Sequence, residues 1–205
     1  MGRGVFRGLT AEEAGPDPIA LFGRWFEDAR RARIYLYDTI CLATTSADGD
    51  PRARMMLLKG FDERGFRFFT NFGSRKAGEL EANARAAIVL HWSVLHRQIR
   101  VEGTVERISE EESAEYFGSR ARGSQIGAWA SRQSAPLQSR EELEQSFRAY
   151  EAEFKGTEVP LPGFWGGFRL KPERIEFWKG RENRMHLREE YVLRESVWIE
   201  RLLSP

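Results

Sequence analysis

The segment YDTICLATTSADGDPRARMMLLKGFDERGFRFFTNF, residues 37–72, contains the pattern that decides the fold. Three runs rich in apolar, β-branched and aromatic residues are separated by two turn sequences, ADGD at 47–50 and DERG at 62–65. Such runs, joined by short turns that contain Asp and Gly, are typical of β-hairpins. The segment therefore predicts three consecutive strands.

The rest of the chain extends this β-rich pattern and inserts helices into it. Further strands are predicted at 85–93, 97–108, 163–180 and 191–203, and helices at 18–32, 73–84, 109–120 and 139–156. There is no βαβ alternation and no glycine-rich dinucleotide motif. We therefore expect a mainly antiparallel sheet or barrel with peripheral helices, in one domain over 18–205 that follows a flexible N-terminal segment, 1–17.

The composition narrows the class of protein. Hydrophobic residues make up 41% and charged residues 31%, which is typical of a globular chain. The formal net charge of +1 gives no general attraction to nucleic acid or to anionic membranes. No apolar stretch approaches a membrane span and no signal peptide is visible, so a cytoplasmic location is expected. The single cysteine, Cys41, excludes an internal disulfide and is predicted to be a small buried core residue.

One candidate anion site lies in FFTNFGSRKAGEL, residues 68–80. Thr70, Ser74, Arg75 and Lys76 meet where a strand is followed by a helix. Free N–H groups at a helix N-terminus, hydroxyls and two cations suit a phosphate group. An ordinary capped helix is the alternative interpretation, and the P-loop pattern is absent.

A second candidate anion site lies in YFGSRARGSQIG, residues 116–127. Tyr116, Arg120 and Ser124 are spaced by four, which places them on one face if a single helix continues through them. They could hold a second phosphate, or they could be structural. In RMMLLK, Arg54 and Lys59 are separated by an odd number of positions, which predicts opposite faces of a strand.

Neutral polar groups and one histidine complete the candidate set. Gln98, Gln133 and Ser134 could recognise the polar edge of a heterocycle or could make structural hydrogen bonds. His186 stands between Arg184 and Arg188, and no histidine shows a metal-ligand spacing, so no metal is expected. The residues by themselves indicate one or two phosphorylated heterocycles on a β-rich scaffold, without naming a reaction.

Seven motifs together add a family resemblance that spans nearly the whole chain. They are RMMLLK (54–59), FFTNFGSRKAGEL (68–80), RQIRVEG (97–103), YFGSRARGSQIGAWASRQS (116–134), VPLPGFWGGFRL (159–170), IEFWKG (175–180) and NRMHLR (183–188). With these motifs the chain resembles the pyridoxamine/pyridoxine 5′-phosphate oxidases. The resemblance implies a homodimeric split β-barrel flavoprotein with FMN at the subunit interface. It also implies oxidation of pyridoxine or pyridoxamine 5′-phosphate to pyridoxal 5′-phosphate in vitamin B6 metabolism, with molecular oxygen giving hydrogen peroxide.

The same resemblance assigns site residues by motif. The FMN contacts that it implies are Arg54, Met55, Met56, Leu57, Leu58, Lys59, Phe69, Thr70, Arg75, Lys76, Gln98, Gln133, Ser134, Trp178 and Arg188. The substrate phosphate would be held by Lys59, Tyr116, Arg120 and Ser124. Arg184 and His186 would lie over the substrate ring as the catalytic pair, and Trp178 and Arg188 would come from the partner subunit.

The chain departs from the family pattern at three places. Leu187 replaces an aspartate in RMHLR, His96 replaces a common glutamate, and the N-terminus lacks the usual Arg-x-x-Tyr-like segment, for which Arg3, Phe6 and Arg7 are a loose substitute. Two alternatives stay open. One is a related split-barrel flavin oxidase acting on another aromatic substrate, and the other is a non-catalytic protein that binds FMN or pyridoxal phosphate.

Overall fold

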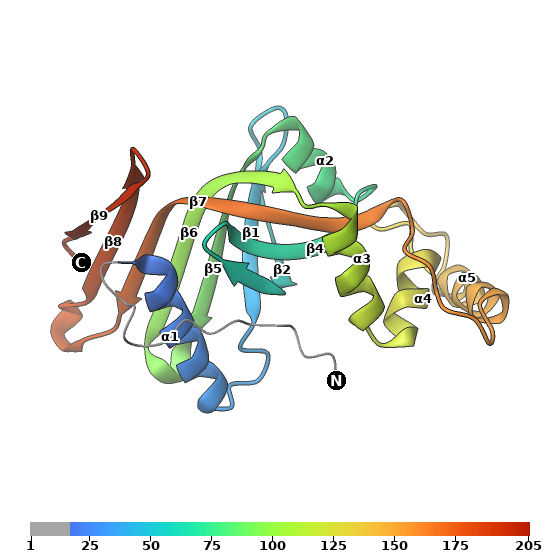
Figure 1. Cartoon of the computed structure of the whole chain (residues 1–205), viewed down its shortest axis with the longest axis horizontal. Coiled ribbons are helices and arrows are strands. Elements are labelled where there is room, and N and C mark those ends of the chain that lie inside the picture. Colours follow the sequence, from blue (N-terminus) through green and yellow to red (C-terminus); the bar gives the residue numbers. More distant parts are fainter. Residues whose placement is uncertain (1–16) are drawn as a thin grey trace.

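The computed structural model describes residues 17–205 (Figure 1), in which nine strands and five α-helices are formed. The strands are β1 (Thr39–Thr45), β2 (Pro51–Leu57), β3 (Gly60–Asp62), β4 (Gly65–Asn71), β5 (Arg85–Trp92), β6 (Arg97–Arg107), β7 (Trp165–Lys179), β8 (Leu187–Arg194) and β9 (Val197–Leu202). The helices are α1 (Pro18–Arg31), α2 (Arg75–Ala82), α3 (Glu110–Ser119), α4 (Arg122–Ala130) and α5 (Arg140–Glu153). The predicted antiparallel, β-rich fold class is confirmed.

All nine strands belong to one antiparallel sheet that curls into a half-barrel with the helices around it (Figure 1). The main order is β2-β1-β5-β6-β7-β4-β3, while β8 pairs with β7 and β9. Strand β7 is the long central element, because its first part pairs with β4 and its last part with β8. A register shift between Glu102 and Gly103 of β6 interrupts the β6–β7 ladder, and such bulges bend a sheet.

The opening segment folds as its turns predict, with one added strand. The β1–β2 turn uses Gly49 at φ +89°, and the β3–β4 turn uses Gly65 at φ +129°, where a Cβ would lie 2.1 Å from the carbonyl oxygen of Leu170. The three predicted strands become four because the chain leaves the β2 ladder at Leu58. The Leu58 N–H donates to the Asp38 carbonyl, and the Lys59 N–H donates to the Arg67 carbonyl.

The C-terminal strand predicted at 191–203 is also divided. It forms the last part of β8 and all of β9, joined by a tight turn at Glu195 and Ser196, both with positive φ. The predicted helix starts are confirmed: Asp17 caps α1 by accepting a hydrogen bond from the Ile19 N–H at 2.8 Å, and Ser109 caps α3. Ser74 precedes α2, although its side chain makes no capping hydrogen bond.

The main core lies between α1 and the curled sheet. Phe22 of α1 is fully buried and makes edge-to-face contacts, with centroids 4.8 Å apart, to both Phe61 and Phe66. Burying one such ring contributes about 1.5–3 kcal/mol, and edge-to-face geometry is favoured between aromatic rings. The amphipathic pattern of α1 is therefore used to close one face of the sheet.

A smaller apolar cluster fixes α3 and α4 over the start of β7. It contains Phe117, Ile126, Phe154, Val159 and Trp165. Because these residues come from α3, α4, the end of α5 and β7, they hold the two short helices beside β4. This second cluster positions the candidate site.

Two predictions about the ends and the core need separate statements. Cys41 is only partly buried, so the prediction of a buried core residue is wrong: in β1 the side chains of Ile40 and Leu42 face the core and that of Cys41 faces the other way. The predicted flexible segment falls outside the described residues except for Asp17. Within the described part of the chain, no helix is long and apolar enough to cross a membrane.

Candidate active site

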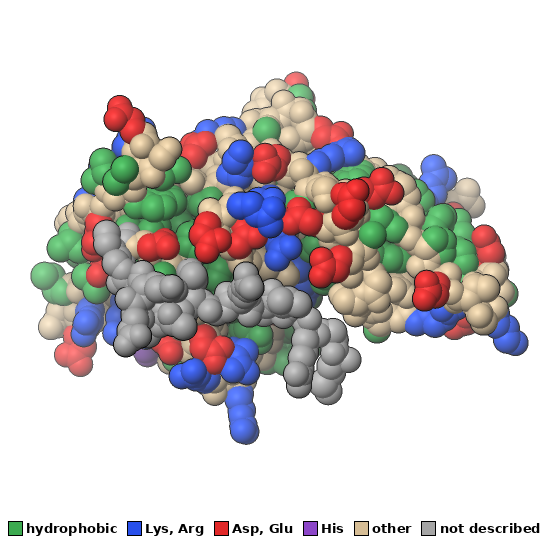
Figure 2. Space-filling model, in the orientation of Figure 1, with side chains coloured by type: hydrophobic (Ala, Val, Ile, Leu, Met, Phe, Trp, Pro, Cys, Tyr) green, Lys and Arg blue, Asp and Glu red, His purple; other side chains and the backbone are tan. Residues whose placement is uncertain are grey.

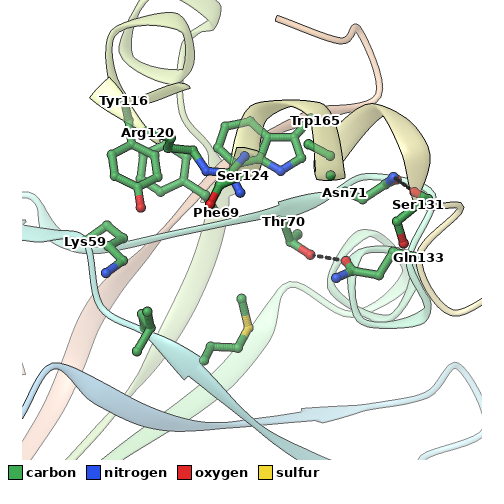
Figure 3. A pocket seen from close by; sticks show the side chains of 14 residues that line it. Lys59, Phe69, Thr70, Asn71, Tyr116, Arg120, Ser124, Ser131, Gln133 and Trp165 are labelled. Carbon is green, nitrogen blue, oxygen red and sulfur yellow. Dashed lines mark hydrogen bonds between the residues drawn. The ribbon is translucent and has the colours of Figure 1, made fainter. Parts of the chain in front are cut away.

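A cavity of about 460 Å³ opens between the sheet and helices α3 and α4 (Figure 3). This volume lies in the usual range for small-molecule sites. Its lining residues come from β2, β4, α3, α4 and the start of β7, and they are Met56, Leu57, Lys59, Phe69, Thr70, Asn71, Tyr116, Arg120, Ser124, Gly127, Ala128, Ser131, Gln133 and Trp165. Most of the motif residues with predicted binding roles in this half of the chain therefore share one space.

Three nearly parallel aromatic rings form one wall of the cavity. The Phe69 ring centroid lies 4.0 Å from that of Tyr116 and 5.5 Å from that of Trp165, with interplanar angles of 27° and 12°. Gly167 permits this packing, because a Cβ there would lie 2.8 Å from the Phe69 ring and 2.4 Å from Ile108. The wall offers a flat apolar surface beside polar groups, as a site for a ring-containing ligand requires.

One end of the cavity holds Lys59, Tyr116, Arg120 and Ser124 (Figure 3). A single helix does not continue through the last three, since α3 ends at Ser119, close to the predicted helix end at residue 120, and α4 begins at Arg122. The three side chains nevertheless line the same cavity, because the break turns α4 back across it.

Arg120 carries unused hydrogen-bonding capacity at this end. Its guanidinium lies 4.7 Å from the Trp165 ring centroid, and its buried Nη1 has no hydrogen-bond partner among the described residues. Burial lowers the pKa of Arg120 and raises that of Tyr116, yet an arginine stays charged in proteins. A buried, charged donor without a partner is suited to an anion such as phosphate.

At the other end of the cavity, the lining residues Thr70 and Gln133 are hydrogen-bond partners of Lys76. Its Nζ donates to Thr70 Oγ1 at 3.1 Å, to Ser74 Oγ at 3.3 Å and to Gln133 Oε1 at 3.0 Å, and Thr70 also donates to Gln133 at 2.8 Å (Figure 3 shows this last bond). Burial, and secondly the charge of Arg54, lower the pKa of Lys76. All three acceptors are neutral oxygens, so a positive charge is held here without a hydrogen-bonded carboxylate.

Arg54 is held next to this end by a buried carboxylate. Glu79, whose side chain is 4% exposed, accepts from Arg52, Arg54 and Thr44 at 2.8, 2.8 and 2.6 Å. Burial opposes ionisation of Glu79, but these hydrogen bonds and the charge of Arg54 lower its pKa overall. Glu79 therefore fixes the two arginines of β2 against α2.

A second group of predicted residues lies at the far end of β7 and does not line this cavity. In the strand register Gln98 is opposite Trp178, and Trp178 is opposite Arg188, so the three stand in one row across β6, β7 and β8. Trp178 is 13 positions from Trp165, and at about 3.3 Å per residue this corresponds to roughly 40 Å along the strand. Figure 1 shows the β8 end of β7 on the opposite side of the molecule from α4.

Arg188 is oriented without the aspartate that Leu187 replaces. Its Nε donates to the buried Glu176 at 2.8 Å and its Nη1 to the Ser204 carbonyl at 2.9 Å. This pairing with Glu176 raises the pKa of Arg188. The orientation of this arginine is thus supplied by β7 and the C-terminal end of the chain.

The loop between β7 and β8 carries Arg184 and His186. Asn183 and Arg184 both have positive φ, 54° and 60°, a backbone conformation that non-glycine residues adopt at a cost. The His186 Nδ1 accepts a hydrogen bond from the Arg181 N–H at 3.2 Å, and its ring lies 4.7 Å from that of Trp178. In the neutral ring the proton is therefore on Nε2, which is free to donate.

Besides Gln98, Trp178 and Arg188, six of the predicted FMN contacts do not line the cavity: Arg54, Met55, Leu58, Arg75, Lys76 and Ser134. Met55 is 65% exposed on the outer face of β2. The side chain of Leu58 is fully buried in the core, so only the backbone of Leu58 could contact a ligand. Arg75 and Ser134 are exposed and do not line the cavity, and Ser134 has φ +72°.

Sequence analysis missed several residues that build the site. Trp165, Asn71 and Ser131 line the cavity, and Glu79 organises its cationic end. Trp165 stands inside the quoted motif FWGGFRL, which was the available signal, whereas nothing local marks Glu79 as the partner of a strand 25 residues earlier.

Comparison with known families gives two matches that together span most of the chain. Residues 26–154 match the family described as pyridoxamine 5′-phosphate oxidase. Residues 165–205 match the region described as the pyridoxine 5′-phosphate oxidase C-terminal dimerisation region. The second match contains Trp178, Arg184, His186 and Arg188, and the first contains every cavity residue except Trp165.

Individual relatives agree with these matches. The chain is 57% identical over 198 residues to the pyridoxine/pyridoxamine 5′-phosphate oxidase of Rubrobacter xylanophilus, covering 97% of this chain and 91% of that protein. It is 47% identical over 205 residues to the protein of the same name from Colwellia psychrerythraea, covering 100% and 94%. Among solved structures, PhzG from Burkholderia lata 383 in complex with tetrahydrophenazine-1-carboxylic acid superposes with a TM-score of 0.89 at 30% identity, covering 98% and 100%.

Proposed function

The chain belongs to the pyridoxamine 5′-phosphate oxidase family, and we propose that it is an FMN-dependent oxidoreductase that converts pyridoxine and pyridoxamine 5′-phosphates to pyridoxal 5′-phosphate. The observation that carries this proposal is one cavity with cations at both ends: Lys59 and Arg120 line one end, and at the other end the lining residues Thr70 and Gln133 accept hydrogen bonds from Lys76, beside which Arg54 lies. Two such grips suit two phosphorylated ligands that meet between them. A flavin nucleotide and a phosphorylated pyridine satisfy both.

The Lys76 end fits the phosphate of FMN. Its ammonium is half-buried among the neutral oxygens of Thr70, Ser74 and Gln133, and its pKa is lowered by burial and by Arg54, so an anion would relieve an unfavourable charge. The residues that would hold the cofactor are Arg54, Met56, Leu57, Thr70, Lys76 and Gln133 from this chain. Bound there, FMN supplies a two-electron acceptor for the carbon that is oxidised.

The Lys59 end fits the phosphate of the substrate. Arg120 presents an unpartnered buried nitrogen, Lys59 a point charge, and Tyr116 and Ser124 hydroxyl groups that can donate. A phosphate held at four points fixes the distance of the pyridine ring from its anchor, and such orientation accounts for much of enzymatic rate enhancement. A substrate without phosphate would leave the Arg120 charge buried and unpaired, which argues against the alternative of a non-phosphorylated aromatic substrate.

Arg184 and His186 would act from the second subunit of a homodimer. They lie at the opposite end of β7 from the cavity, in the region that matches the family's dimerisation region. Exposed apolar side chains, Val197, Ile199 and Leu202, gather on β9 at the same end (Figure 2). A two-fold dimer would bring this end of each chain to the cavity of the other. There the Nε2–H of His186 and the Arg184 guanidinium would orient and polarise the substrate ring.

The electron acceptor and the location complete the proposal. Oxidation of the alcohol of pyridoxine phosphate to the aldehyde removes two electrons and two protons, and molecular oxygen can take up both to give hydrogen peroxide. Pyridoxamine phosphate gives the same aldehyde after water releases ammonia. We expect the reaction to take place in the cytoplasm.

The test is aerobic turnover by the FMN-loaded protein. Pyridoxal phosphate and hydrogen peroxide should form in equal amounts from pyridoxine phosphate, while pyridoxine without phosphate should react at least about tenfold less efficiently, because it cannot use the Arg120 grip. Equal turnover of both substrates would contradict the assignment of that grip and favour another aromatic substrate. FMN-loaded protein that forms neither product would indicate a binding role.

A further inference from the structure

Lys59 has a fixed carboxylate partner at the edge of the substrate phosphate grip. Its Nζ lies 2.8 Å from Oδ2 of Asp38, and the two side chains are 24% and 19% exposed. Lys59 lies at the junction between β2 and β3, where its N–H donates to the Arg67 carbonyl, and Asp38, just before β1, is tied to this junction because its carbonyl accepts from the Leu58 N–H. The ion pair is therefore a built feature of this corner.

The Asp38 carboxylate is also within electrostatic reach of the rest of the grip. Burial raises the pKa of Tyr116, the charge of Arg120 lowers it, and the charge of Asp38 raises it by a smaller amount. Figure 3 shows Tyr116 and Lys59 on the same side of the cavity. With Lys59 and Arg120 positive and Asp38 negative, the net charge of this end is +1 instead of +2.

A phosphate that binds Lys59 must share it with Asp38. Two oxygens that each lie about 2.8 Å from one tetrahedral nitrogen are separated by roughly 4.6 Å. At that distance, the repulsion from a carboxylate weakens phosphate binding by at least about fivefold even with water-like screening. In a partly buried site the weakening is larger. Against this, a partly exposed ion pair that orients a lysine is expected to contribute less than about fivefold.

Because repulsion outweighs orientation, we propose that Asp38 is a positioning and affinity-setting residue that weakens the phosphate grip so that the phosphorylated product can leave. This inference rests on the proposed function, since it requires that Lys59 and Arg120 bind the substrate phosphate. Asp38 keeps the Lys59 ammonium in one place and lowers the net charge that holds the product. It acts through Lys59, with which it is paired, and has no part in the chemical step.

The experiment uses FMN-loaded Asp38→Asn protein, which keeps the shape of the side chain and removes its charge. The inhibition constant of inorganic phosphate and that of pyridoxal 5′-phosphate should each fall about fivefold, the KM for pyridoxine phosphate should fall, and kcat should not rise. Raising the salt concentration should reduce the difference from wild type. Asp38→Glu, which restores the charge, should return these constants toward those of wild type.

Asp62→Asn is the matched control, because Asp62 is also paired with a cation, Arg64 at 2.9 Å, and Arg64, unlike Lys59, does not line the cavity. Its phosphate inhibition constant should equal that of wild type. Unchanged or weaker phosphate binding in Asp38→Asn would overturn the inference.

Lys59→Met and Arg120→Met separate this outcome from failure of the proposed function. If both variants bind phosphate as well as wild type does, the substrate grip itself is wrongly assigned. If both bind it more weakly while Asp38→Asn shows no gain, the grip stands and the role of Asp38 is wrong.

Discussion

The two ends of strand β7 differ in how far their polar side chains are buried and paired within the chain. At the Trp165 end, helices α3 and α4 cover the cavity, and two of the nearby cations have carboxylate partners in the same chain, Asp38 for Lys59 and Glu79 for Arg54. At the Lys179 end, Arg184 is exposed, His186 is half-buried, and both project from a loop with positive φ angles. The first end is a finished binding cavity, whereas the second presents side chains outward.

If the proposed site is correct, one chain contains all of its groups and cannot bring them together by itself. The residues of the proposed substrate phosphate grip lie together within one protomer because a local apolar cluster holds α3 and α4 beside β4. The groups proposed to act on the substrate ring are some 13 strand positions away. A two-fold dimer would place the Trp165 end of each chain beside the Lys179 end of the other. This would complete two equivalent sites.

The largest expected effect is a loss of turnover when the groups at the Lys179 end are removed. Arg184→Ala combined with His186→Ala should lower turnover on the order of 10³-fold and leave FMN bound, since the pair is proposed to orient and polarise the substrate. Arg120→Ala should also lower turnover, because it weakens substrate binding.

A hybrid dimer tests whether the two ends act across the subunits. It combines one chain carrying Arg184→Ala and His186→Ala with one chain carrying Arg120→Ala, and two different tags isolate it. It should recover about half of wild-type turnover, because one of its two sites has the unmutated cavity of the first chain and the unmutated loop of the second.

One result of the hybrid measurement would contradict a site shared between the two chains. If purified hybrid dimers are no more active than the two parent variants, all these groups act within one chain, and the contrast between the two ends of β7 loses its functional meaning. Each parent variant reassembled with itself is the control for recovery caused by handling.

The next effect concerns the carboxylate that organises the first end. Glu79→Gln should lower the free energy of unfolding by about 2–3 kcal/mol, because it leaves Arg54 and Arg52 beside a neutral group. Urea unfolding followed by fluorescence measures it. Glu27→Gln, which removes a surface carboxylate paired with Arg30 and Arg31, should cost less than about 1 kcal/mol.

The same residue gives a pH dependence whose sign follows from its lowered pKa. The stabilisation by ionised Glu79 is fully present above the ordinary carboxyl pKa and is lost as the pH falls through the lowered, folded-state value. The difference in stability between wild type and Glu79→Gln should therefore shrink in acid. A difference that stays constant with pH would show that the ionised carboxylate is not responsible.

The smallest expected effect is a change of FMN affinity with pH that depends on Lys76. Because the pKa of Lys76 is lowered, this lysine loses its proton at a lower pH than an ordinary lysine does, and the affinity for FMN should fall about fivefold as it does so. Lys76→Arg stays charged and should lack this alkaline loss. Titration with riboflavin, which has no phosphate, corrects for ionisation of the flavin, and an identical pH profile for both proteins would contradict the phosphate contact.

Much of the fold was predictable because its signals are local. The turns at Gly49 and Gly65, the caps at Asp17 and Ser109 and the alternation along β1 depend on residues a few positions apart. The errors also have local causes. Helix α4 was not predicted because its glycines, Gly123 and Gly127, weaken the local helical signal. Cys41 was misplaced because its neighbours, and not its own side chain, face the core.

The sequence by itself determined the strands, the helix starts, the family and the identity of the cationic groups, because each of these is written in short motifs or periodicities. The tertiary structure alone decided which of those groups share a cavity, that Asp38 and Glu79 are their counter-ions, and that Arg184 and His186 stand apart from them. The physical reason is that such contacts join residues from strands and helices distant in the chain. They depend on the curl and register of the sheet, which the pattern of any one segment does not encode.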